Sequence, residues 1–167
     1  MTPETLEWLS IKAPGFASLS VEERDAIDDF SFLWSLFEGK VMNGRCDVPR
    51  IRSYVESLEH ENCLNALDSD QYIGYLRNRY YRDGNETHYF QGLHLERSGN
   101  PEEVPEALSN LEATKSLKVS GCLIIIFRLR NNLFHGEKWQ YDLEGQLENF
   151  TQANLFLKSL MYGDING

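Results

Sequence analysis

The sequence predicts an all-α protein, an up-and-down helical bundle of about five to seven helices, and three observations favour this fold class. Apolar residues recur at steps of three and four along nearly the whole chain, which is the spacing of one helix face. No pair of strands joined by a hairpin turn is evident, and no internal repeat is found. At 167 residues the chain is expected to form a single domain, residues 1–167, with a core of its own.

The N-terminal half is expected to hold three helices after an N-terminal extension, residues 1–19. The first helix begins at a capping box formed by Ser20 and Glu23, and the Asn-Gly pair at 43–44 ends it. Asp47 can cap the second helix, and the third ends at the Asp-Gly pair at 83–84. The apolar faces of the three helices carry Ile27, Phe30, Trp34, Phe37 and Val41, then Ile51, Tyr54, Val55 and Leu58, then Tyr72, Ile73, Tyr75, Leu76 and Tyr80.

The C-terminal half is expected to hold an irregular connection followed by three helices. Residues 84–105 contain several turn-forming residues and no clear apolar period, which is typical of a connection. A short helix is expected over 106–113. The next helix is expected from about Leu117 to His135, with Gly136 as its C-cap. The last helix carries apolar residues from Leu143 to Met161.

The composition indicates a cytoplasmic protein. Hydrophobic residues make up 41% and charged residues 25% of the chain, as in ordinary globular domains. The three cysteines, Cys46, Cys63 and Cys122, are odd in number and widely spaced, which favours a reducing compartment over a disulfide framework. No stretch has the length of a membrane span or the pattern of a signal peptide, so no membrane association is expected.

The net charge of -10 argues against a protein that binds duplex nucleic acid without specificity, because such binding depends on neutralising phosphates. The net negative charge, however, sits at the two ends of the chain, because the bases of the middle segment nearly balance its acids. Residues 40–138 hold 13 of the 16 lysines and arginines, so a local basic cleft is compatible with the acidic whole.

The most informative segment is 127–138, which reads Phe-Arg-Leu-Arg-Asn-Asn-Leu-Phe-His-Gly-Glu-Lys. It follows the apolar run 122–126, so a buried helix is expected to end in arginine, asparagine and histidine side chains. Burying such groups is costly unless they pair, bind a ligand or react. The segment is therefore the candidate functional site.

The spacing Arg130-x4-His135, with Asn131 directly after the arginine, resembles the signature of HEPN domains. The wider stretch from Arg128 to Lys138 is similar to the Apea-like branch of that family. The resemblance implies a HEPN-like bundle and a metal-independent endoribonuclease without cofactors, possessing a composite site across a homodimer. Such proteins act in phage defence and toxin-antitoxin systems, so an antitoxin or another partner protein is a further expectation. Glu137 stands where partner-silenced HEPN toxins often carry tyrosine, which puts that mode of control in doubt.

The resemblance assigns catalysis to Arg130, Asn131 and His135. An imidazole titrates near neutral pH, so His135 can move a proton between the ribose 2′-OH and the leaving 5′-oxygen. The guanidinium of Arg130 suits the charge of the pentacoordinate phosphorus, and Asn131 can orient the histidine or a phosphate oxygen. The expected products carry 2′,3′-cyclic phosphate and 5′-OH ends.

Three further residues are expected to contact the RNA substrate, namely Arg128, Asn132 and Lys138. Arg128 is also the alternative catalytic arginine, because it lies seven positions before His135 and so shares its helix face more directly.

Two other functions stay open at this point. The same fold can serve as a non-catalytic interaction or nucleotide-sensing module that dimerises and acts through a partner protein. Alternatively, the polar helix end is purely structural and satisfies carbonyl groups of a loop.

A second group of residues carries a weaker signal. Arginines at 77, 79 and 82 alternate with tyrosines at 72, 75, 80 and 81, a combination that can stack and hold single-stranded RNA. An amphipathic helix with half-buried tyrosines and solvated arginines is the simpler interpretation. His88 and His94 lack the spacing of metal ligands on a helix, and no metal site is expected.

Overall fold

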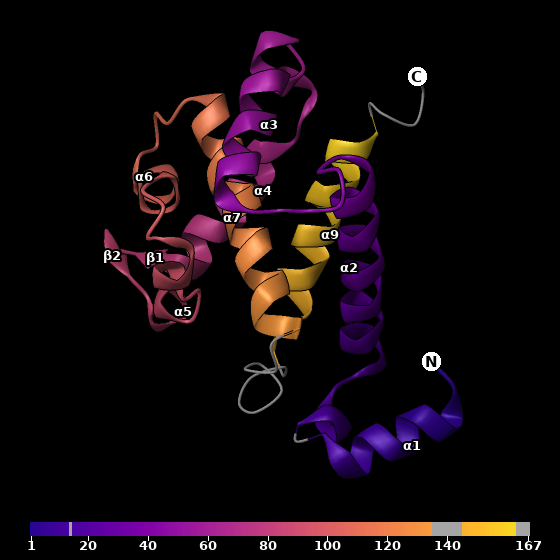
Figure 1. The fold of residues 1–167 in the computed structure, drawn as a ribbon. Coiled ribbons are helices and arrows are strands. Elements are labelled where there is room, and N and C mark those ends of the chain that lie inside the picture. The colour runs from indigo at the N-terminus through magenta and orange to yellow at the C-terminus, as the bar shows by residue number, and fades with distance from the viewer. Residues whose placement is uncertain (14, 135–144, 163–167) are drawn as a thin grey trace.

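The computed structural model describes residues 1–13, 15–134 and 145–162, and its helices form a bundle (Figure 1). This confirms the predicted all-α fold class. The described residues contain eight α-helices, one more than the expected range, because α1 and α5 form within the segments expected as extension and connection. The α-helices are α1 (Pro3–Lys12), α2 (Val21–Lys40), α3 (Val48–His60), α4 (Ser69–Tyr80), α5 (His88–Gln91), α6 (Glu103–Ser109), α7 (Lys115–Phe134) and α9 (Leu147–Met161). Short 3-10 helices occupy η1 (Phe16–Ser18), η2 (Leu64–Ala66) and η3 (Leu95–Ser98).

Helix α7 is the centre of the bundle. Its residues 119–126 are all buried, and the helix packs against α3, α4 and α6. Gly121 permits the close approach of α6, because a Cβ atom at this position would lie 2.7 Å from the Cβ of Ala107. Such a contact is shorter than van der Waals packing allows, so the absence of a side chain at 121 sets the spacing of these two helices.

Helices α2 and α9 pack side by side along most of their lengths (Figure 1). Ser20 and Glu23 make the predicted capping box in full, which fixes the start of α2. The rings of Phe30 and Phe150 lie 5.1 Å apart between the two helices. Trp34 of α2 reaches Phe127 of α7, with 6.2 Å between ring centroids, and so joins this pair of helices to the central one.

The turn at 83–84 forms a small β-hairpin, so the prediction that no strand pair is present was wrong. Strands β1 (Tyr81–Arg82) and β2 (Asn85–Glu86) pair antiparallel. Asp83 and Gly84 both have positive φ, 51° and 77°, as a type I′ turn requires. The strands are too short for an alternating apolar pattern, which is why the Asp-Gly pair was interpreted as a helix stop.

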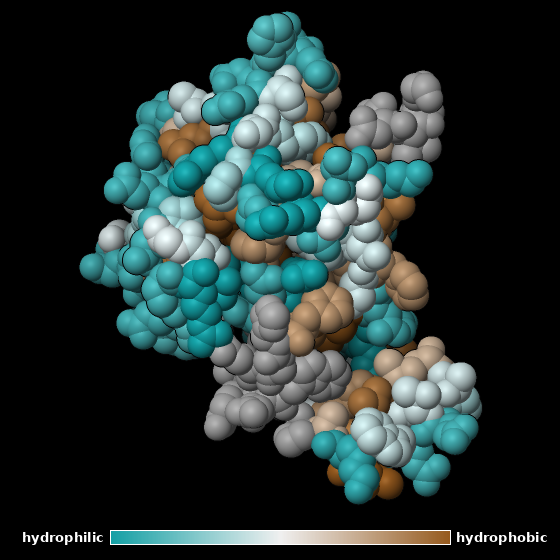
Figure 2. All heavy atoms as spheres, in the orientation of Figure 1, coloured by the Kyte–Doolittle hydropathy of each residue, from teal (hydrophilic) through white to brown (hydrophobic). Residues whose placement is uncertain are grey.

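Of residues 1–19, the segment around Phe16 and Leu19 packs into the core, while α1 lies on the surface. Helix α1 buries no side chain completely, whereas Phe16 and Leu19 enter the core. Trp8 and Ile11 of α1 are exposed, and Figure 2 shows apolar side chains gathered over this corner while hydrophilic side chains cover much of the rest of that face. Among the described residues, no helix is long and apolar enough to cross a membrane.

Candidate functional site

The predicted site lies at the C-terminal end of α7, which ends at Phe134 in the described part of the chain. Arg128, Arg130, Asn131 and Asn132 occupy its last two turns. His135, Gly136 and Lys138 lie outside the described residues, as does Leu143 of the last predicted helix. Of the motif, the structure therefore describes the arginine and asparagine residues.

Arg128 is buried, with 4% of its surface exposed, and its guanidinium group is used within the protein. Nε donates to the carbonyl oxygen of Leu93 at 2.9 Å. Nη1 donates to Oγ of Ser98 at 3.2 Å, and Nη2 donates to Oδ1 of Asn132 at 3.2 Å. These bonds offset the cost of burying the charge and favour a structural role for Arg128.

Asn132 extends the same network. It is buried, and its Nδ2 donates to the carbonyl oxygen of Gly92 at 2.9 Å while its Oδ1 accepts from Arg128. Arg128 and Asn132 together hold the segment 92–98, which includes η3 and directly follows α5. Arg128 and Asn132, two of the three residues expected to contact substrate, therefore use their polar groups in hydrogen bonds to this segment.

Arg130 points to the other side of α7, towards α2. Its Nη1 donates to Oδ1 of Asn131 at 2.9 Å, and its Nη2 lies 3.5 Å from Oε2 of Glu38. The guanidinium carbon lies 5.5 Å from the ring centroid of Phe134, within the range of a cation–π contact. The side chain keeps 30% of its surface exposed, so Arg130 is reachable from solvent where Arg128 is not.

Glu38 is the residue of this site that the sequence did not reveal. Its Oε2 also accepts from Nε1 of Trp34 at 3.2 Å, and its Oε1 accepts from the backbone N–H of Cys46 at 3.1 Å. Burial, reinforced by Glu38, raises the pKa of the Cys46 thiol to about 12, so this cysteine stays protonated. Glu38 and Arg130 are 92 positions apart, and they meet only because the fold places the side chains of α2 beside α7.

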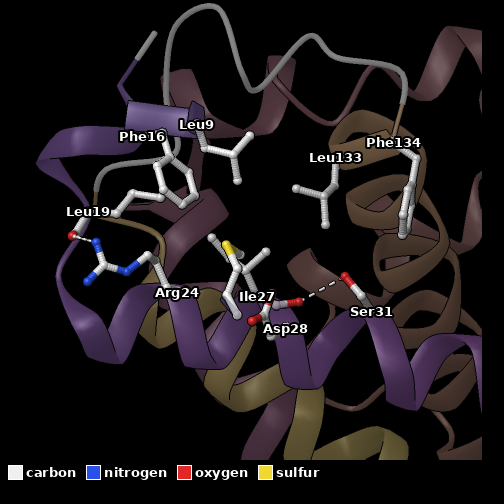
Figure 3. A pocket seen from close by; sticks show the side chains of 10 residues that line it. Leu9, Phe16, Leu19, Arg24, Ile27, Asp28, Ser31, Leu133 and Phe134 are labelled. Carbon is white, nitrogen blue, oxygen red and sulfur yellow. Dashed lines mark hydrogen bonds between the residues drawn. The ribbon is translucent and has the colours of Figure 1, made fainter. Parts of the chain in front are cut away.

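An apolar cavity of about 300 Å³ borders the last turn of α7 (Figure 3). Leu133 and Phe134 face Leu9 and Phe16 across it, and α2 contributes Ile27. The last turns of α7 thus have two different sides. One side is hydrogen-bonded to the segment 92–98, and the other borders the apolar cavity beside η1.

The alternating tyrosines and arginines of α4 and β1 divide into two groups. Arg77 donates to the carbonyl oxygens of Ala107 and Asn110 and so caps the end of α6, which makes it structural. Tyr72 and Tyr80 are buried in the core. The remaining members of the group are Tyr75, Arg79, Tyr81 and Arg82, of which Tyr75, Arg79 and Arg82 line a second cavity.

Comparison with protein-family models, with curated proteins and with solved structures finds no match for this chain. Within the described ranges, no group of three or more histidine, cysteine, aspartate or glutamate side chains is placed to hold a metal ion.

Proposed function

We propose that the chain is a metal-independent endoribonuclease of the HEPN type. The observation that carries the proposal is the pair of Arg130 and Asn131, hydrogen-bonded to each other at the partly exposed end of a buried helix and followed by His135 at the motif's spacing. A planar guanidinium next to an amide is suited to binding the oxygens of a phosphodiester.

The surroundings of the pair support the proposal on physical grounds. Catalytic groups work best on rigid elements whose orientation is fixed by neighbouring contacts. The burial of residues 119–126 fixes α7, and the network of Arg128 and Asn132 fixes its last turns against the segment 92–98. In this proposal Arg130, rather than Arg128, is the arginine that meets the phosphate.

The proposed reaction needs an acid and a base. One protomer supplies one histidine of the motif, so a site made by two copies across a twofold axis would supply both groups. A homodimer at micromolar concentration is therefore part of the proposal, and light scattering that finds only monomer would count heavily against it.

The deciding experiment is digestion of RNA in excess EDTA by the wild type and by His135→Ala. We expect the wild type to leave 2′,3′-cyclic phosphate and 5′-OH ends, and His135→Ala to lose about 100-fold or more of the rate. Arg130→Lys keeps the charge but loses the planar fork, so it should not restore the activity lost in Arg130→Ala. Arg50→Ala, an exposed arginine on α3, is the matched control and should cut like the wild type.

A second candidate function is a non-catalytic module that dimerises and acts through a partner protein. The ion pair between Arg130 and Glu38 favours it, because a paired arginine is partly neutralised. The exposed rings of Phe32 and Phe134 favour it as well, since exposed aromatic groups suit protein contacts. If the wild type forms a folded dimer but cuts no RNA, the ribonuclease proposal fails and the interaction module becomes the proposed function.

A further inference from the structure

A polar and aromatic cavity lies between α4, α5 and α9, built from residues that the proposed chemistry does not use. Its volume of about 300 Å³ is at the lower end of the range for pockets that bind small molecules, roughly 300–1,000 Å³. The lining residues that bear on its ligand are Tyr75, Asn78, Arg79, Arg82, His88, Tyr89 and Glu148.

The guanidinium group of Arg79 is held in a fixed position. Its Nη2 donates to Oε1 of Gln146 at 3.0 Å, and its guanidinium carbon lies 4.3 Å from the ring centroid of Tyr89. Its Nε is buried and has no hydrogen-bond partner among the described residues. The positive charge of this guanidinium group, held at the cavity wall, favours an anion in the cavity.

The charge of the lining also favours an anion. Arg79 and Arg82 face a single carboxylate, Glu148, in a chain whose net charge is -10. A positive site on an acidic protein selects anions locally while the rest of the surface repels them. Arg82 lies on β1 and is exposed, so the hairpin presents a guanidinium group that a phosphate can reach from solvent.

Aromatic rings complete the site. The rings of His88 and Tyr89 lie 3.9 Å apart between centroids, and both side chains are exposed at the cavity. Arg79 lies over the ring of Tyr89 and His88 packs against it, so a nucleobase can stack on the exposed outer face of this pair, a contact that is tolerant of sequence. Asn78 and Glu148 add donors and acceptors suited to a base edge or a ribose hydroxyl.

We propose that this cavity binds one nucleotide of a single-stranded RNA, with Arg79 and Arg82 on its phosphate and the rings of His88 and Tyr89 on its base. The proposal names a substrate subsite and in that respect rests on the proposed ribonuclease function. Helix α5, which lines the cavity, leads directly into the segment 92–98 that Arg128 and Asn132 of α7 hold.

The test measures binding of a fluorescein-labelled single-stranded RNA by anisotropy in EDTA, in the His135→Ala background so that no cleavage occurs. We expect Arg82→Ala to weaken binding about tenfold, since it removes a charge-assisted hydrogen bond from an exposed side chain. Arg50→Ala changes the net charge equally outside the cavity and should alter the dissociation constant less than twofold. Equal losses in the two variants would overturn the proposal.

Two further measurements separate the base from the phosphate and the subsite from catalysis. Tyr89→Ala should weaken RNA binding at least fivefold through lost stacking, while uridine 5′-monophosphate should shift the Arg79 Nε resonance in the NMR spectrum of the full chain. RNA cleavage whose KM is unchanged by Arg82→Ala would refute the subsite and leave the ribonuclease intact. The converse result is also possible: the wild type binds the mononucleotide but cuts no RNA, and Arg82→Ala abolishes the binding. That result would refute the ribonuclease and support the subsite.

Discussion

At the scale of single residues, the motif separates two arginines that look alike in the sequence. Arg128 and Arg130 are separated by a single residue. Arg128 bonds to the segment 92–98, whereas Arg130 bonds to Glu38 and Asn131. On a helix, positions two apart point to different sides. The identity of the structural arginine could not be predicted, because its partners are carbonyl and hydroxyl oxygens of a distant segment.

Arg128→Ala should destabilise the protein by about 2–4 kcal/mol, because the carbonyl oxygen of Leu93 and Oδ1 of Asn132 would lose their donor in a buried place. Arg128→Lys should recover only part of this loss, since an ammonium group cannot reach three acceptors in the geometry of a guanidinium. Urea unfolding measures both. Arg130→Ala serves as comparison, and its half-exposed side chain should cost less than Arg128→Ala.

Glu38→Gln should strengthen binding of RNA by about threefold to tenfold, because it removes the negative charge that competes with phosphate for Arg130. Stability should fall by about 1 kcal/mol, since one of the acceptor oxygens of Glu38 is lost. Anisotropy in the His135→Ala background and thermal melts give the two values. Glu22→Gln makes the same charge change in the first turn of α2, and an equal gain there would show that the effect is not local.

At the scale of elements, local signals in the sequence predicted the main helices well. The capping box at Ser20 and the apolar period after it place α2 correctly, and the apolar run 122–126 lies in the buried part of α7. The segment after the hairpin was less predictable. Helices α5 and η3 are short, so their stability comes from contacts with other elements, α5 with α4 and η3 with Arg128 of α7, rather than from a pattern of their own.

Gly121 lies at the contact of α6 with α7, whereas Gly74 lies in open space on α4, so alanine substitutions at the two positions should have opposite effects on stability. Gly121→Ala should destabilise by about 1–3 kcal/mol, because the added methyl would meet Ala107 and the carbonyl oxygen of Glu103. Gly74→Ala is the control inside α4, where a Cβ meets no atom within 4 Å, and it should stabilise by about 0.5–1 kcal/mol through helix propensity. Thermal or urea unfolding gives both values, and a stabilising Gly121→Ala would contradict the packing described.

At the scale of the whole molecule, the acidic surface and the few available cations set the expected strength of RNA binding. Of the described arginines expected to contact RNA, Arg77 and Arg128 are committed to protein carbonyl oxygens, which leaves Arg79, Arg82 and Arg130. Counting lysines and arginines in the sequence overestimates the number that can bind phosphate, because the count does not show which of them are bonded to protein carbonyl oxygens.

The dependence of RNA binding on salt should accordingly be shallow. Each phosphate contact to a single strand contributes about 0.7 to the slope of log K against log salt concentration. Three arginines, with Lys138 as a fourth cation, predict a slope of roughly two to three. Anisotropy titrations between 50 and 300 mM NaCl would measure it, and a slope near ten would mean that many more phosphates are contacted.

The hydrogen bond from the indole of Trp34 to Glu38 gives the molecule an optical reporter of its own. Trp34 is buried, and the carboxylate that its N–H contacts is the one that holds Arg130. If a phosphate draws Arg130 away, the charge facing the indole changes, and the wavelength of tryptophan emission changes with it. Replacing Trp8 and Trp139 by phenylalanine would leave this one emitter, so occupancy of the arginine could be followed in real time without a label.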